Sequence, residues 1–194
     1  MPTAAGRRRH LLAVLERHGL SLAVAETART TGLRLREETI RHRIERGVLI
    51  DAETGDLLDG VIAGSGDRLE LGPLLIGMAP GRRYVCVHTH PDSTSLSVLD
   101  VGLLVEHPAV VFVAALGVDG TWFAGSFDPQ QPLPSSQAVY EAYVTTYHVT
   151  LEQYQALRAA GQLTRRQVAR RHSHDIWVQA GPVLVLRYDR VERT

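Results

Sequence analysis

Lysine is missing from this chain of 194 residues, in which all 21 basic residues are arginine. A protein without lysine cannot be tagged on a side-chain amine. That property suits an enzyme working among conjugated proteins or a toxin that enters a foreign cytosol. The codon bias of a GC-rich genome explains the same composition without any such selection. The absence of lysine therefore permits both interpretations.

Cysteine and long apolar runs are scarce as well. A single cysteine, Cys86, excludes an internal disulfide and fits a reducing compartment, so we expect a cytoplasmic protein. The apolar stretch behind the Arg-rich start is interrupted by Glu16, Arg17 and His18. The sequence therefore predicts neither a signal peptide nor a membrane span there.

Neither sign of charge prevails over the whole chain, whose formal net charge is +0 at pH 7. The first 46 residues nevertheless hold ten Arg against five Glu. This asymmetry predicts a basic N-terminal surface, although Arg-rich helices are more often solvated faces. The composition, 44% hydrophobic and 22% charged, is that of one globular domain with extensions.

Apolar periodicity predicts helices and strands mixed along the chain. Expected helices cover residues 7–18, 21–32, 35–46, 97–107, 137–161 and a segment from 164 onward. Expected strands cover residues 47–51, 56–63, 67–71, 83–88, 109–117, 121–127 and 182–188. This order indicates an α/β fold in which a mixed β-sheet is flanked by helices.

The expected organisation has three parts. Residues 1–34 form an N-terminal helical extension, residues 35–127 the core, and residues 128–194 a C-terminal helical extension with a terminal strand. The Pro-containing linker at 128–136 separates the last two parts. We expect that residues 128–194 cover the site, form a homodimer or bind a partner chain.

A candidate site lies where an apolar strand runs into His88 and His90. Residues i and i+2 of a strand point to the same face, so both rings can converge on one ion. Pro91 ends the strand and leaves the two rings at the rim of the sheet. Neutral imidazole is a common zinc ligand, and a third ligand must come from elsewhere.

Asp100 is the best candidate for that third ligand. If Ser97 caps the next helix, Asp100 occupies its third position and faces back toward the preceding loop. Ser-x-x-Asp is also an ordinary capping box, which is the alternative interpretation of these two residues. Two histidines and one carboxylate would form a three-ligand zinc site with a fourth position left for water, the catalytic arrangement.

These residues resemble a known family. His-Thr-His-Pro at 88–91, followed by Ser-Val-Leu-Asp at 97–100, is similar to the signature of the JAMM metalloproteases, also called the MPN or JAB domain. The resemblance covers residues 35–127 and implies the three-layer, cytidine-deaminase-like architecture of that family. Members include deubiquitinating isopeptidases and bacterial relatives in phage, toxin and ubiquitin-like modification systems. The loop between Pro91 and Ser97 is one residue shorter than in the eukaryotic isopeptidases, which leaves the substrate open.

The resemblance also implies roles for individual residues. His88, His90 and Asp100 would hold Zn²⁺, and a glutamate at the end of the first core helix would be the general base. Glu45 matches that glutamate, with a solvated charge at a helix end as its alternative interpretation. Ser97 would donate a hydrogen bond to the developing oxyanion, or it serves only as the helix cap. The implied activity is hydrolysis of a peptide or isopeptide bond in a protein or ubiquitin-like conjugate.

Other patterns support competing interpretations. Cys86 shares a strand face with His88. It is interpreted either as a small buried core residue or as a thiol that supports or regulates the candidate ligand. His172 and His174 repeat the spacing on a predicted helix, where their rings point about 200° apart and cannot share an ion. A non-catalytic MPN scaffold is one rival function. A DNA-binding helix-turn-helix of three short helices in the first 47 residues is another, although nucleic acid is the less favoured partner.

Overall fold

The computed structural model describes residues 3–58, 60, 62–64 and 72–192. Along these residues the elements follow one another in the order α1 (Ala4–Arg17), α2 (Leu22–His42), β1 (Arg46–Asp51), β2 (Ile62–Ala63), α3 (Gly72–Ile76), β3 (Tyr84–His90), α4 (Val98–Glu106), β4 (Val110–Gly117), β5 (Trp122–Phe127), α5 (Ser136–Ala159), α6 (Arg165–Leu184) and β6 (Leu186–Val191). The expected α/β class is confirmed.

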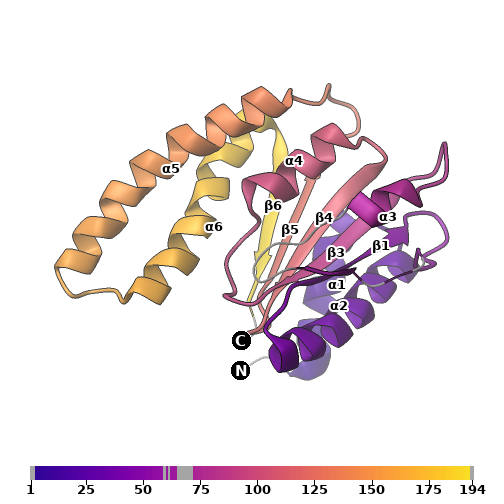
Figure 1. The fold of residues 1–194 in the computed structure, drawn as a ribbon, viewed down its shortest axis with the longest axis horizontal. Helices are drawn as coiled ribbons and strands as arrows, with labels where there is room; N and C mark the ends of the chain where they lie inside the picture. The colour runs from indigo at the N-terminus through magenta and orange to yellow at the C-terminus, as the bar shows by residue number, and fades with distance from the viewer. Residues whose placement is uncertain (1–2, 59, 61, 65–71, 193–194) are drawn as a thin grey trace.

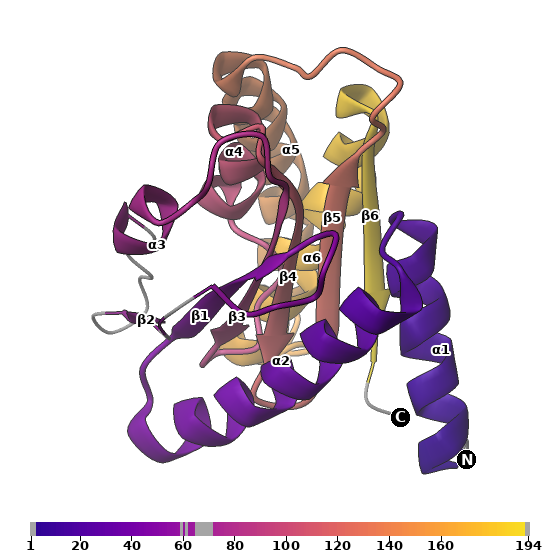
Figure 2. The same cartoon turned by 90° about the vertical axis from the view of Figure 1, so that its right-hand side faces the viewer.

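The strands form one mixed sheet in the order β2-β1-β3-β4-β5-β6. β3 and β4 are parallel and are joined through α4, whereas every other neighbouring pair is antiparallel. Helices α1 and α2 cover one face, and α4, α5 and α6 lie on the other (Figures 1 and 2). The molecule therefore has three layers, with a hydrophobic core on each side of the sheet.

Helix α2 corrects the prediction of two helices over 21–32 and 35–46, because it runs unbroken through Gly32. A Cβ at Gly32 would lie 2.4 Å from Cη2 of Trp122 on β5, so the glycine permits close packing of helix on sheet rather than a helix end. The three short helices required for a helix-turn-helix are therefore not formed.

The ends of the other elements differ less from expectation. The strands β1, β3, β4 and β5 and the helices α4 and α5 are confirmed. Of the strand expected at 56–63, the described residues form only β2, which pairs with β1, and an isolated bridge from Leu57 to Ile50. The last strand is shifted: α6 continues through Pro182 to Leu184, and β6 begins at Leu186. Short apolar runs such as this one do not distinguish helix from strand. The strand expected at 67–71 lies outside the described residues.

Both expected extensions contact the sheet. α2 runs across the boundary expected after position 34, between the N-terminal extension and the core. α1 contributes Leu12 and Leu15 to the hydrophobic core on this face of the sheet. His18, at the end of α1, bonds to Ser126 on β5 and Asp189 on β6 at 2.7 and 3.1 Å. At the other end of the chain, β6 pairs with β5.

Within the described residues, no helix has both the length and the apolar character needed to cross a membrane.

Candidate metal centre

Strand alternation decides which side chains of β3 face the candidate site. Val85 and Val87 belong to the core under α1 and α2, whereas Tyr84 and Cys86 belong to the core under α4. His88 and His90 follow the parity of Cys86 and point toward α4. The sequence prediction that the two rings share a face, which they also share with Cys86, is thus confirmed. Pro91 ends the strand as expected.

The third candidate ligand comes from the first turn of α4. Ser97 is the N-cap, and its Oγ accepts a hydrogen bond from the Asp100 N–H at 3.2 Å. Asp100 Oδ2 in turn accepts from the Ser97 N–H at 2.6 Å, which completes a capping box. The capping box and the ligand position were predicted as alternatives. Asp100 fulfils the first while its carboxylate faces both histidines.

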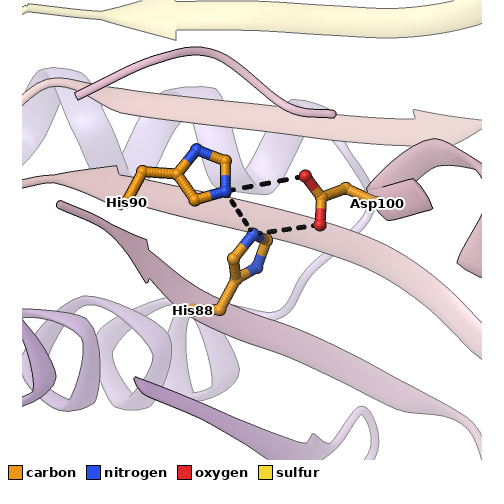
Figure 3. Close-up of side chains that lie close together, drawn as sticks. All are labelled: His88, His90 and Asp100. Atoms are coloured by element: carbon orange, nitrogen blue, oxygen red, sulfur yellow. Dashed lines mark hydrogen bonds and ion pairs between the residues drawn. The ribbon is translucent and has the colours of Figure 1, made fainter. Parts of the chain in front are cut away.

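Three side chains converge in Figure 3. His88 Nε2 lies 3.0 Å from His90 Nε2 and 3.1 Å from Asp100 Oδ1, and His90 Nε2 lies 3.6 Å from Asp100 Oδ2. Donors bound about 2.0–2.1 Å from one tetrahedral ion would be about 3.4 Å apart, so these separations fit a shared metal ion. The group could hold a metal ion.

The protonation of the cluster follows from burial and mutual contact. Burial disfavours a charged His88, but the adjacent Asp100 carboxylate outweighs this and raises the pKa of His88 well above its usual value. Burial and the neighbouring His88 together lower the pKa of His90. Burial alone would raise the pKa of Asp100, yet His88, His90 and the Ser97 N–H lower it. Without a metal, the cluster is therefore an ion pair of His88 and Asp100 beside a neutral His90.

The tautomer of His90 follows from its second nitrogen. His90 Nδ1 lies 2.9 Å from the Thr94 carbonyl oxygen, to which it can only donate, so the lone pair of the neutral ring is on Nε2, toward the cluster. A histidine that ligates a metal commonly donates its other N–H in this way. Among the described residues, His88 Nδ1 has no partner of regular hydrogen-bond geometry. The fully buried Cys86 thiol is close enough to help raise the pKa of His88.

Glu45 lies beside the cluster, although not where the sequence placed it. α2 ends at His42, and Glu45 belongs to the short connection to β1, which already contains Gly47. Its Oε1 is 3.9 Å from His90 Nε2, and the residue is 7% exposed. That separation exceeds a direct hydrogen bond and suits a carboxylate that faces a water at the cluster. The buried position argues against a merely solvated charge.

Thr89 ties this connection to the strand of the two histidines. Its side chain points to the opposite face, where Oγ1 contacts Thr39 Oγ1 on α2 at 2.6 Å and accepts from the Arg46 N–H at 3.0 Å. The end of α2 and the start of β1 are thereby fastened to β3. This contact fixes the residue between them, Glu45, relative to His90.

A cleft of about 760 Å³ opens next to the cluster. Glu45, His90, Ser97 and Asp100 line it, so four of the five predicted site residues border one solvent space. His88 lies behind them with 1% exposure. His172 and His174 have separate partners, Tyr147 and Tyr188, as expected for rings on different sides of a helix.

Sequence reasoning missed the partners of the loop that joins β3 to α4. We call residues 91–97 the ligand loop. Ser173 and Trp177 of α6 and Tyr188 of β6 bond to it. Their only signal in the sequence was the apolar spacing of α6, which does not reveal a contact with a distant loop.

Comparisons of the chain with protein-family models, with curated proteins and with solved structures gave no match. The chemistry of the site therefore has to be argued from its own residues. A His-His-Asp group with two buried histidines, beside a second carboxylate and open to a cleft, can hold a cation and accept a proton from a molecule bound next to it.

Proposed function

We propose that this protein is a zinc-dependent hydrolase that cleaves a peptide or isopeptide bond in a protein or ubiquitin-like conjugate, as its resemblance to the JAMM/MPN family implies. The observation that supports this most is the convergence of His88, His90 and Asp100 with Glu45 placed 3.9 Å from His90 Nε2. Two imidazoles and one carboxylate are a ligand set suited to zinc, with one position left open.

A zinc ion held by His88, His90 and Asp100 would act as a Lewis acid and would lower the pKa of a water toward neutrality. In the proposed reaction Glu45 accepts a proton from the attacking water and passes it to the leaving amine. In this proposal the substrate binds in the cleft that Glu45 and Ser97 line.

Ser97 can combine the two roles predicted for it. As N-cap its oxygen accepts a hydrogen bond, which leaves its own proton free to be donated. In the proposed reaction that proton stabilises the oxyanion that forms on the carbonyl oxygen of the substrate.

Metal content is the first test. We expect about one zinc per wild-type chain by elemental analysis, and none in the His88→Ala/His90→Ala double variant. His10→Ala/His148→Ala is the matched control, because it removes two exposed histidines and should keep the metal. A folded wild-type chain without zinc would leave a non-catalytic scaffold as the better interpretation.

Activity is the second test. Isopeptide-linked ubiquitin dimers and linear ubiquitin fusions serve as probes of the two bond types. Glu45→Gln should retain zinc and lose at least about 100-fold in rate, as expected when a general base is removed. Equal rates in the variant and wild type would contradict the role of Glu45.

A further inference from the structure

One side of α6 faces the ligand loop. Arg170, Ser173 and Trp177 occur at spacings of three and four residues, so their side chains form one stripe along the helix. Each bonds to the loop: Arg170 Nε to the Asp92 carbonyl at 3.1 Å, Ser173 Oγ to the Ser95 N–H at 3.0 Å, and Trp177 Nε1 to the Leu96 carbonyl at 2.6 Å.

β6 adds a fourth contact. The Tyr188 hydroxyl lies 2.6 Å from Ser95 Oγ and 2.7 Å from His174 Nδ1, so it links the loop to α6 a second time. Ser95 is 2% exposed and Trp177 is fully buried. Four hydrogen bonds to Asp92, Ser95 and Leu96 leave the loop little freedom.

The contact of Ser173 reaches the cluster through a single peptide group. The peptide between Thr94 and Ser95 accepts from His90 Nδ1 on its carbonyl side and donates to Ser173 Oγ on its amide side. Because a peptide unit is planar, holding its N–H fixes the direction of its C=O. Ser173 is held in turn by donating to the Arg170 carbonyl at 3.2 Å.

We propose that α6 is a positioning element of the metal centre: its stripe of Arg170, Ser173 and Trp177 holds the ligand loop, and Ser173 sets the ring and tautomer of His90 through the Thr94–Ser95 peptide. The proposal rests on the metal site proposed above. It assigns to the C-terminal segment a task inside the site.

Ser173→Ala tests the central contact. It removes the acceptor of the Ser95 N–H, and we expect zinc affinity, measured by competition with a chromogenic chelator, to fall about tenfold, as for other partners behind a ligating histidine. Ser173→Thr keeps the hydroxyl and should restore most of the affinity. Ser135→Ala is the matched control, because Ser135 Oγ also accepts a backbone N–H, at 3.1 Å, but at the start of α5.

The metal-free protein gives an independent reading. ¹⁵N shifts of the His90 ring should report the Nδ1–H tautomer in wild type and in Ser135→Ala, and a mixture of tautomers in Ser173→Ala. A wild-type chain that binds no zinc would overturn the proposed function, and the ring shifts would still decide this inference. If a folded Ser173→Ala variant had the same His90 ¹⁵N shifts as wild type, or the same zinc affinity, the proposed role of Ser173 would be wrong.

Tyr188→Phe tests the second link. It removes the hydroxyl between Ser95 and His174, and amide exchange of Ser95 should accelerate about fivefold, which corresponds to one hydrogen bond worth about 1 kcal/mol. Tyr154→Phe is the control, because its hydroxyl bonds to Asp175 and not to the ligand loop. Unchanged exchange at Ser95 in Tyr188→Phe would show that Tyr188 does not hold the loop.

Discussion

Asp100 joins the local structure of a helix to the chemistry of the cluster. One of its oxygens accepts the Ser97 N–H within the capping box, and the other lies 3.1 Å from His88 Nε2. The carboxylate therefore cannot rotate away from the histidines without losing its place in the capping box. A preorganised ligand of this kind follows directly from the Ser-x-x-Asp spacing.

Ser97 permits its two roles to be separated by substitution. Ala at an N-cap lowers stability by about 1 kcal/mol, whereas Gly lowers it by only a few tenths. Neither residue has a hydroxyl, so we expect both variants to lose about 100-fold or more in hydrolysis rate. Urea denaturation combined with the ubiquitin-probe assay distinguishes the roles. A Ser97→Gly variant as active as wild type would restrict Ser97 to capping.

Among the elements, the packing of α2 on the sheet depends on the absence of a side chain at Gly32. Ala is a better helix former than Gly by about 1 kcal/mol, but a Cβ at position 32 would meet Trp122 at 2.4 Å. Trp122 is 5% exposed and has little room to move. We therefore expect Gly32→Ala to lower the free energy of unfolding by about 1 kcal/mol or more, since overpacking of a core outweighs propensity.

Gly102, inside α4, is the control for that prediction. A Cβ there would meet only Glu106 Oε1, at an ordinary 3.9 Å. Gly102→Ala should therefore raise the free energy of unfolding by up to about 1 kcal/mol. If both variants shifted in the same direction in urea denaturation, the packing argument for Gly32 would be wrong.

The last residue of β1, Asp51, is a carboxylate whose pKa is altered by the turn that follows it. Hydrogen bonds from the N–H groups of Thr54 and Glu53, with the Arg82 guanidinium, lower the pKa of Asp51 from 3.8 to about 2, although burial opposes this. Because the folded-state value lies below the unfolded one, the contribution of Asp51 to stability is complete above about pH 4. It is lost as the pH falls toward about 2.

Asp51→Asn should remove that dependence. We expect the free energy of unfolding of the variant to fall less steeply than that of wild type between about pH 4 and pH 2, so that the two values converge in acid. Urea midpoints measured across this range provide the check. Parallel curves would show that Asp51 contributes nothing to the acid sensitivity of the fold.

For the whole molecule, a bound metal should act as a clamp on the folded state. Its ligands lie on β3 and α4, so an ion bound only by the folded chain stabilises both elements at once. At a zinc concentration about 100 times the dissociation constant, the gain is about 2.7 kcal/mol. For a chain of this size, that corresponds to a rise in melting temperature of roughly 5–10 °C.

Calorimetry with zinc and with a chelator measures this difference. The rise should disappear in His88→Ala/His90→Ala and persist in His10→Ala/His148→Ala. Equal melting temperatures of the wild type in the two conditions would argue for a cluster held by its own hydrogen bonds.

Local pattern determined a large part of this protein from the sequence alone. Period-two alternation predicted that His88 and His90 share one face of a strand. The Ser-x-x-Asp spacing predicted a helix start at Ser97 and Asp100. Both predictions were possible because strand pleat and helix capping involve residues close in the chain. The mixed α/β sheet followed from the order of the elements. The helix end predicted at Gly32 is wrong. The sequence does not distinguish a glycine that ends a helix from one that allows a ring of another element to pack closely.

Only the tertiary structure decided which distant segments meet at the site. The chain path and the paired strands bring Glu45 to His90, and α6 reaches the ligand loop from 78 residues away. Hydrogen bonds between such segments have no periodicity in the sequence, since they depend on how the layers pack rather than on neighbouring residues. The sequence therefore indicated the candidate ligands, and packing of α6 and β6 against the sheet decided which residues hold the loop beside them.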